Sequence, residues 1–447
     1  MVAPSNAAVD QLALKLIAVQ AQLPDQARFS LLRLGVTSSM HQAVRPFCFD
    51  SLVEQQRAAQ TRHNKASDTI ERDIRAKQQA AEQLLADQRR AEAGGRRDLA
   101  AKLRRDHRDK LAQVDKLRAE MKKPLNHKSR KDVERIAVER TLAEADVILT
   151  TLSSSLTSHM EKYLVHGLGT SKAVGPLRPV SVCIMDEASQ AVEPEALIPL
   201  KYGFCKLVMV GDHEQLPATV TSRKAQQLDY QQSLFSRLIS CLSGAGAGSP
   251  VLRLDTQYRM HPDIGDWPAR YFYGGKLSHA APVRSLGLAP VTCLHVVGDT
   301  LQADGACWNK VEERVVMATI EAVKSLVGEE LNIGVISFYA KQKQNILAEV
   351  TRRRMVNVVV NTVDGFQGSE RDVIVISCVR SGAGTSIGFL QDRQRLNVAL
   401  TRAKHCLVVV GDTAALRYCL NMNIYAQKNI LFVFSISVKL VKCGENS

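Results

Sequence analysis

The chain has 447 residues, of which 45% are hydrophobic, so it is long enough to form two or three globular domains with sizeable cores. Its formal net charge of +14 favours a polyanionic partner, with nucleic acid ahead of an anionic membrane, although the same charge could cover solvated helices. No apolar stretch approaches the length of a bilayer-spanning helix, and the ten cysteines include no C-x-x-C pair. The composition therefore excludes a membrane-spanning protein and indicates a reducing, intracellular compartment without a structural metal.

The first residues predict a loop that enters a helix. Ser5 or Asn6 fits the N-cap position, because apolar residues recur at helical spacing from Val9 onward. A strand normally precedes such a loop, so we expect the natural domain to begin before Met1. Residues 1–50 are then the start of a first, incomplete α/β domain.

Residues 51–130 have a different composition, rich in Lys, Arg, Glu, Asp, Gln and Ala. Apolar residues recur here at steps near three and four, the spacing of a narrow seam on a helix. They are Ile70, Ile74, Leu84, Leu85, Leu99, Leu103, Leu111, Val114, Leu117 and Met121. Gly94-Gly95 divides them, which predicts an antiparallel hairpin of two long helices. This arm could lie over bound nucleic acid, or it could be a solvated spacer or a protein-docking stalk.

After Pro124 the pattern becomes mixed α/β. Near-continuous β-branched runs are typical of parallel strands that are covered on both faces and meet ligands at their carboxyl ends. The runs are Val147–Leu149, Val182–Met185, Leu207–Val210, Ile333–Ile336, Val373–Ile376 and Leu407–Val410. Small residues at 244–250 predict a linker between the rest of the first domain (131–243) and a second domain (251–420). Residues 421–447 form an atypical tail.

The most informative motif is Asp186-Glu187, which follows the apolar run Val180–Met185. At the carboxyl end of a buried strand, Asp186 could hold Mg²⁺ and Glu187 could polarise an attacking water, as in nucleotide hydrolysis. The alternative is that the pair only caps the following helix. The usual partner of such a pair, a G-x-x-x-x-G-K-[ST] phosphate loop, does not occur between Met1 and Ser447.

Two clusters further along the chain carry groups that a phosphoryl-transfer site needs. Gln215, in the segment Gly211–Pro217, could sense a γ-phosphate and link hydrolysis to movement. Tyr258 could stack on a base, and Arg259 could neutralise the charge that develops on a phosphate. Taken singly, these clusters could also be a polar turn and a surface Tyr-Arg pair.

Two more clusters lie near the carboxyl end. In Asn361–Glu370, glycines such as Gly368 allow close approach of a phosphate or sugar, and Glu370 could accept a ribose hydroxyl. Arg402 lies on a predicted helix with other basic residues and is a second candidate arginine finger. The alternatives are a glycine-rich turn and a solvated basic face.

Together the clusters resemble motifs Ia, Ic, II, III, IV, V and VI of superfamily 1 helicases, in the branch that includes the nonsense-mediated-decay helicase and senataxin. The matching segments are Pro4–Asp10, Thr150–Ser153, Asp186–Gln190, Gly211–Pro217, Gln257–Pro262, Val363–Glu370 and Asn397–Lys404. Ala218–Ala225 and Tyr230–Phe235 look most like senataxin and its fungal homologues. The resemblance implies an α/β fold of two RecA-like P-loop NTPase domains, with the helical hairpin arm inserted in the first.

The resemblance also implies roles for individual residues, with ATP and Mg²⁺ as cofactors. Those that would act in hydrolysis are Glu187, Gln215, Arg259 and Arg402, with Asp186 at the metal. Those that would bind the nucleotide are Tyr258, Gly368 and Glu370. Those that would face the backbone of single-stranded RNA or DNA are Ser5, Asn6, Thr150, Thr151 and Thr362. Such contacts read no base sequence, so translocation would be largely sequence-independent.

The implied function is that of an ATP-dependent 5′-to-3′ RNA/DNA helicase of the senataxin type. Its partners would be a single strand or an RNA–DNA hybrid, and protein partners could dock on the arm; we expect a monomer in the nucleus, with the cytoplasm as the alternative. The nuclear location depends on the family and on basic stretches at Lys122-Lys123 and Lys128–Lys131.

In this family a phosphate loop precedes motif Ia, so we expect these residues, as a fragment, to hydrolyse ATP poorly or not at all. The segment Ile424–Ser447 also departs from the family, which favours a partial or mis-predicted gene product. The alternative function is a non-catalytic, nucleic-acid-binding or regulatory pseudo-helicase. A small-molecule NTPase or kinase would require the other motifs to be coincidence.

Overall fold

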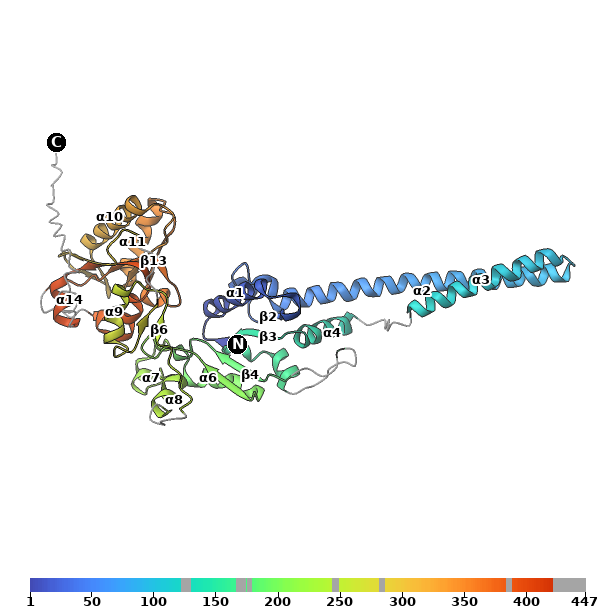
Figure 1. Cartoon of the computed structure of the whole chain (residues 1–447), viewed down its shortest axis with the longest axis horizontal. Helices are drawn as coiled ribbons and strands as arrows, with labels where there is room; N and C mark the ends of the chain where they lie inside the picture. Colours follow the sequence, from blue (N-terminus) through green and yellow to red (C-terminus); the bar gives the residue numbers. More distant parts are fainter. Residues whose placement is uncertain are drawn as a thin grey trace, which may run out of the picture. The chain divides into compact units, whose positions relative to one another are not determined.

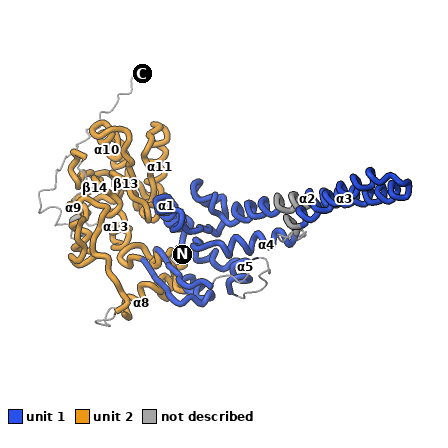
Figure 2. Tube along the Cα trace, turned by 45° about the vertical axis from the view of Figure 1, so that its right-hand side comes forward, with its two compact units in different colours: residues 1–186, 194–210 blue, residues 187–193, 211–447 orange. Residues whose placement is uncertain are grey.

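The computed structural model describes residues 1–121, 130–165, 174, 179–242, 249–280, 286–382 and 388–420, apart from the side chains of 61–68, 119–121, 130 and 417–420. These residues form two compact units, coloured separately in Figure 2. Unit 1 comprises residues 1–186 and 194–210, and unit 2 comprises residues 187–193 and 211 onward. Within the described ranges, no helix combines the length and the apolar character needed to cross a membrane.

Several predictions concern residues outside this description. Most of the linker 244–250, the tail 421–447 and the basic pair Lys122-Lys123 are among them. Residues 211–242, which the composition assigns to the first domain, pack with unit 2. The domain boundary at 244–250 therefore stays a prediction.

Unit 1 is built on a five-stranded parallel sheet with the strand order β2-β3-β1-β4-β5. Helices cover both faces, because successive strand residues point to opposite sides. Leu31 packs with helix α1 (Asn6–Gln22) on one face, and Leu32 packs with α4 (Arg130–Ala143) on the other. The strands are β1 (Val2–Ala3), β2 (Leu31–Arg33), β3 (Val147–Thr151), β4 (Val182–Met185) and β5 (Lys206–Met209). Short helices α5 (Ser158–Met160) and α6 (Glu193–Leu197) follow β3 and β4.

The two edges of this sheet differ in how well they are covered. All three side chains of β2 are buried, and Arg33 forms a further bridge with Cys48. The opposite edge strand, β5, pairs only with β4 in the described structure, and its apolar residues are half-buried. Val210, directly after it, is exposed. The other three residues of β5 are apolar, so Lys206 is the only charged residue of this edge strand.

The predicted helical hairpin is confirmed. Helix α2 (Phe49–Ala93) and helix α3 (Arg97–Met121) lie side by side and are joined at Gly94-Gly95, with Gly95 at a left-handed φ of 70° (Figure 1). The buried residues of the seam are Ile74, Ala81, Gln88, Ala91, Ala100 and Val114.

The predicted seam is wrong at two positions. Leu99 and Leu111 are 43% and 42% exposed, whereas the neighbouring Ala100 and Val114 are buried. Small side chains allow the two helices to approach closely, so the buried stripe is narrower than the apolar spacing predicts. Leucines at the flanks of this stripe remain in solvent.

Unit 2 is built on a second five-stranded parallel sheet, with the order β12-β11-β13-β14-β8. Its strands are β8 (Val291–His295), β11 (Ile333–Ser337), β12 (Val358–Thr362), β13 (Arg371–Ser377) and β14 (Ala403–Gly411). The predicted runs at 333–336, 373–376 and 407–410 are thus confirmed as parallel strands. Two small pairs accompany the sheet: β6 (Thr256–Gln257) with β7 (Ser278–His279), and β9 (Leu301–Ala303) with β10 (Ala306–Trp308).

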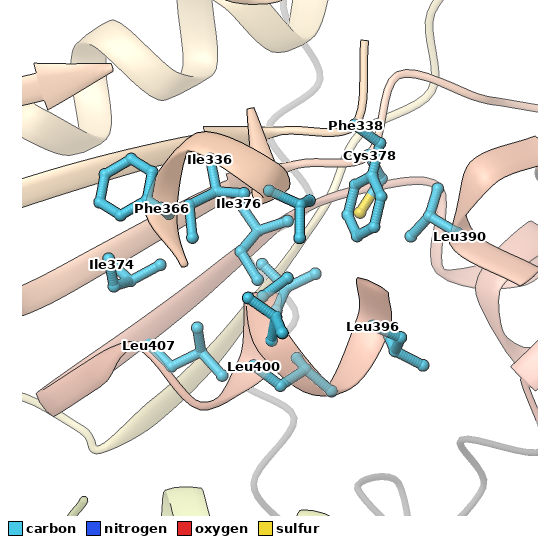
Figure 3. Close-up of a cluster of buried hydrophobic side chains, with 14 of the residues drawn as sticks. Ile336, Phe338, Phe366, Ile374, Ile376, Cys378, Leu390, Leu396, Leu400 and Leu407 are labelled. Carbon is cyan, nitrogen blue, oxygen red and sulfur yellow. The ribbon is translucent and has the colours of Figure 1, made fainter. Parts of the chain in front are cut away.

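Both faces of this sheet are covered, as the β-branched runs predict. On one face, Ile374 and Ile376 pack with Leu396 and Leu400 of helix α13 (Arg393–Leu400), as Figure 3 shows. On the other face, Val373 and its neighbours pack against helices α10 (Lys310–Val327) and α11 (Ala340–Arg352). The helices of unit 2 are α7 (Arg223–Gln227), α8 (Leu234–Leu242), α9 (Pro262–Tyr271), α10 (Lys310–Val327), α11 (Ala340–Arg352), α12 (Val363–Phe366), α13 (Arg393–Leu400) and α14 (Thr413–Leu420).

A buried carboxyl group fastens the start of α10 to the end of β13. Glu312 is fully buried, and its Oε2 accepts hydrogen bonds from Ser377 Oγ at 2.7 Å and from the Val379 backbone N–H at 2.8 Å. Burial raises the pKa of Glu312 to about 7; the two hydrogen bonds oppose this shift and the nearby Asp412 adds to it. The carboxyl is therefore partly protonated at neutral pH.

Candidate functional site

The carboxyl edge of the unit 1 sheet gathers several of the predicted residues. Val2 of β1 lies opposite Thr150 of β3 and Met185 of β4, so the residues that follow these strands meet at one edge. Ser5 is the N-cap of α1, as predicted, and its hydroxyl accepts a hydrogen bond from the Ala8 N–H at 3.2 Å. Asn6, the first helical residue, is exposed.

Thr150 and Thr151 lie within this edge and not on its surface. Both side chains are buried, and the Thr151 hydroxyl accepts a hydrogen bond from the Ser154 N–H at 3.1 Å. The exposed residue at this point of the chain is Ser153, whose hydroxyl donates to Glu195. Contact of Thr150 and Thr151 with nucleic acid stays a prediction.

Asp186 and Glu187 follow β4 directly and are half-buried. Glu187 adopts a left-handed conformation with φ of 50°, which is costly for a residue with a Cβ and is concentrated at functional positions. Its Oε2 accepts a hydrogen bond from Gln190 Nε2 at 2.5 Å. The strained turn and the amide together fix the direction of the carboxylate.

The donor set at Asp186 fits magnesium. Mg²⁺ prefers oxygen ligands, keeps several of its waters and is held by one or two carboxylates plus phosphate oxygens. Asp186 offers one such carboxylate, and the described ranges contain no cluster of three or more His, Cys, Asp or Glu residues of the kind that would cage a metal entirely in protein.

A chain of hydrogen bonds joins Gln215 to four other residues of unit 2. Arg402 Nη2 donates to Gln215 Oε1 at 3.1 Å, and Gln215 Nε2 donates to Asp212 Oδ2 at 2.8 Å. The same Asp212 oxygen accepts the Tyr273 hydroxyl at 2.6 Å, and that hydroxyl accepts from Asn397 Nδ2 at 2.9 Å. The amide of Gln215 is thereby fixed at both ends.

The prediction that Arg402 lies on a helix is wrong, because α13 ends at Leu400 and Arg402 lies in the turn before β14, where it carries a positive charge inside this network. It is 2% exposed, and its Nε also donates to the Val398 carbonyl oxygen at 3.0 Å. Burial and the neighbouring Arg259 lower the pKa of Arg402 to about 10, against the opposing effect of Glu187. The group is still charged at neutral pH, but the charge is poorly compensated, which suits it to receive an anion.

Arg259 and Glu370 form an ion pair. Arg259 Nε lies 2.7 Å from Glu370 Oε2, Arg259 Nη1 donates to the Thr401 carbonyl, and Lys404 Nζ lies 3.1 Å from Glu370 Oε1. Partial burial opposes ionisation, but the hydrogen bonds from Arg259 and Lys404 prevail and lower the pKa of Glu370. Glu370 is therefore a fixed carboxylate between two cations.

Tyr258 and Gly368 lie close to these charged residues in the sequence, Tyr258 directly before Arg259 and Gly368 two positions before Glu370. Tyr258 is 80% exposed, so its ring face is free to stack. Gly368 has a left-handed φ of 72°, a conformation that side chains disfavour. Thr362 ends β12 and caps α12, where its hydroxyl accepts from the Gly365 N–H at 3.4 Å.

A polar cavity of about 320 Å³ adjoins Gln215. Its lining contains no Lys or Arg, so it offers hydrogen-bonding groups but no positive charge for a phosphate. The lining residues are Ser189, His213, Gln215, Pro217, Asp229, Gln231, Gln232, Ser233, Ser236 and Gln394.

Sequence reasoning finds Gln215 and Arg402 but misses Asp212, Tyr273 and Asn397. Tyr273 lies 61 positions from Asp212, and Asn397 lies 124 positions from Tyr273. No periodic signal in the sequence pairs polar side chains over such distances. The one available clue is the aromatic run Tyr271–Tyr273 at the carboxyl end of a helix.

The family models that match this chain and the relatives that are similar to it indicate the same protein family. Two family models, each described as an AAA domain, match residues 1–223 and 230–414. The chain is 31% identical to "Helicase SEN1" of Saccharomyces cerevisiae, covering 93% of this chain and 19% of that protein. It is 34% identical to "Probable helicase senataxin" of Mus musculus, covering 93% of this chain and 16% of that protein.

Other similarities are shorter or weaker. "Regulator of nonsense transcripts 1" of Caenorhabditis elegans is 34% identical, over 64% of this chain and 26% of that protein. Among solved structures, the arterivirus nonstructural protein 10 helicase with DNA has a TM-score of 0.31 at 14% identity, over 62% of this chain and 45% of that chain. The chain thus spans about a fifth or less of the length of Sen1 and senataxin.

Proposed function

This chain belongs to the superfamily 1 helicases, in the group of Sen1 and senataxin, and we propose that it is the ATP-dependent motor region of an RNA/DNA helicase. The observation that carries the proposal is the buried, poorly compensated charge of Arg402, which is held against the amide of Gln215. A guanidinium in such a place can stabilise negative charge that develops on a transferring phosphoryl group.

The roles of the site residues follow from their chemistry. Bound ATP with Mg²⁺ supplies the phosphoanhydride and the Lewis acid. Asp186 would hold the metal, and Glu187, directed by its strained turn, would orient the attacking water. Arg402 and Arg259 neutralise phosphate charge, and Gln215 senses the γ-phosphate. Tyr258 stacks on the base, Gly368 gives the nucleotide room and Glu370 accepts a ribose hydroxyl.

The nucleic-acid partner is a single strand of RNA or DNA, or an RNA–DNA hybrid, moved in the 5′-to-3′ direction by a monomer. Exposed Asn6, with Ser5 and Thr362, contacts the backbone. The helical arm either lies over the strand or docks a protein partner. We place the protein in the nucleus.

The 447 residues contain no G-x-x-x-x-G-K-[ST] sequence, so nothing in them cradles the β- and γ-phosphates in the usual way. We propose that these residues by themselves hydrolyse ATP poorly or not at all. The same observation favours a second candidate, a non-catalytic nucleic-acid-binding or regulatory protein.

One substitution tests the catalytic proposal. In a longer form of the protein that carries a phosphate loop, Glu187→Gln should abolish nucleic-acid-stimulated ATP hydrolysis and leave binding of single strands unchanged. Hydrolysis that survives the substitution contradicts the assignment. For the 447 residues alone, salt-sensitive binding that ATP does not alter supports the second candidate, whereas ATP-dependent release of the strand contradicts it.

A further inference from the structure

Asn6 lies at the start of α1 with one end of its amide already engaged. Arg33 Nη2 donates a hydrogen bond to Asn6 Oδ1 at 2.8 Å. A guanidinium has only donors, so the end of the amide that faces it must be the oxygen. The Asn6 side chain is exposed, and its NH₂ group makes no hydrogen bond within the described part of the chain. The donor end of the amide is therefore free.

Arg33 is held rigidly from the interior. It is fully buried, its Nε donates to Asp10 Oδ1 at 3.1 Å, and its Nη1 donates to the Leu34 carbonyl oxygen. Asp10 is anchored in turn, because its Oδ2 accepts the His41 N–H at 2.6 Å. The remaining nitrogen, Nη2, donates to Asn6, which is the exposed residue of this chain of contacts. The buried pair thus fixes which end of a surface amide points outward.

We propose that Arg33 is a positioning residue, which orients Asn6 so that the NH₂ end of the amide donates to an acceptor oxygen on the nucleic-acid backbone. This inference rests on the proposed function. A phosphodiester presents only acceptors, so a fixed donor matches it, whereas a freely rotating amide would present its oxygen part of the time. The chemistry selects an acceptor such as a phosphate oxygen and disfavours a group that has only donors, such as a protonated amine.

The decisive variant is Asn6→Asp. A carboxylate keeps the acceptor for Arg33, so the thermal melting temperature should be unchanged or higher. The outward atom becomes an anionic oxygen, and affinity for a fluorescein-labelled oligouridine should fall about tenfold or more, at least the value of one hydrogen bond to a charged group. Gln22→Glu, an exposed position roughly 24 Å further along α1, is the charge-matched control and should have little effect.

A double-mutant cycle tests whether Arg33 acts through Asn6. Arg33→Lys keeps the charge opposite Asp10 but loses the fork that also reaches Asn6. It should weaken oligouridine binding in the wild-type protein and have no further effect in the Asn6→Ala background, while it lowers the melting temperature in both. A merely structural role would lower affinity equally in both backgrounds.

The outcomes separate the two proposals. If the Asn6→Asp variant binds as well as wild type, or if the effects of Arg33→Lys and Asn6→Ala are additive, the proposed role of Arg33 is overturned. The helicase proposal is then left intact. A wild-type chain that binds no single strand at all overturns both. Loss of binding in Asn6→Asp with an unchanged melting temperature, together with a non-additive cycle, is the expected result.

Discussion

Arg402 and Gln215 are 187 positions apart in the sequence, yet Nη2 of the arginine lies 3.1 Å from Oε1 of the glutamine. The proposed finger and the proposed γ-phosphate sensor are therefore connected directly. A phosphate that attracted Arg402 would break the hydrogen bond between this arginine and the Gln215 oxygen. Gln215 would still donate to Asp212, so the change would reach Tyr273 through that carboxylate.

Replacing Arg402 should stop catalysis and spare binding. Arg402→Met removes the buried charge but keeps much of the side-chain volume. We expect nucleic-acid-stimulated ATP hydrolysis, measured in a form that carries a phosphate loop, to fall by about a thousandfold or more, the usual effect of losing an arginine finger. Arg352→Met is the control, because Arg352 lies exposed on α11 in an ion pair with Glu349, and it should retain activity. Comparable losses in both variants would contradict the role of Arg402.

Removing one hydroxyl should weaken unit 2. Tyr273→Phe deletes the donor to Asp212 and the acceptor for Asn397, while burial and Asp212 keep the pKa of this phenol above its ordinary value, so it stays a donor. Leaving the Asp212 carboxylate with one bond fewer should cost about 1–3 kcal/mol in the free energy of unfolding by urea. The matched control is Tyr271→Phe, since Tyr271 stacks on Trp267 through its ring, and its loss of a hydroxyl should have little effect.

Stability should depend on pH through Glu312. The folded state keeps its proton up to about pH 7, whereas the unfolded chain releases it near pH 4.5, so the free energy of unfolding should fall as pH rises through this window. The groups that face the carboxyl are Ser377, the Val379 N–H, Cys378 and Asp412.

Glu312→Gln should remove this dependence. It is expected to gain up to about 3 kcal/mol over wild type at pH 8 and little at pH 4.5. Urea unfolding at the two pH values measures the difference, and the exposed Glu330→Gln is the control. A wild-type protein that became more stable between these pH values, with Glu312→Gln following it, would contradict the assignment.

The arm offers a matched pair of positions. Val114 is 1% exposed in the seam, whereas Leu111, one turn earlier, is 42% exposed. Val114→Lys places an unpaired charge between α2 and α3 and should loosen the hairpin, with faster limited proteolysis of the arm. Leu111→Lys should leave the proteolysis rate near that of wild type. Equal rates for the two variants would show that the seam is not where the structure places it.

The sheets are the part of the fold that sequence reasoning predicts best. Runs such as Val373–Ile376 are buried on both faces, so every residue is apolar and the strand is recognisable without knowledge of its neighbours. The cap at Ser5 and the turn at Gly94-Gly95 are local as well, because each depends on the chemistry of one or two residues.

What the sequence does not predict depends on partners far along the chain. Thr151 suits a surface contact by residue type, but its β-branched side chain fits equally well inside β3, and only the packing decides between them. Leu99 fits the helical spacing of the apolar residues, but its side chain is exposed, because the neighbouring Ala100 occupies the buried position between the two helices. The bond between Arg402 and Gln215 needs the tertiary fold to exist.

The open flank of β5 affects how the isolated chain behaves at high concentration. Natural sheets blunt their free edges with charges, prolines or bulges. This strand has one charge, Lys206, beside half-buried Leu207, Val208 and Met209, and among the described residues no strand pairs with its outer side. Such an edge is a template for any compatible extended segment. Purified by itself, the chain should self-associate with rising concentration, and lysine substituted at Val208 should suppress the aggregates.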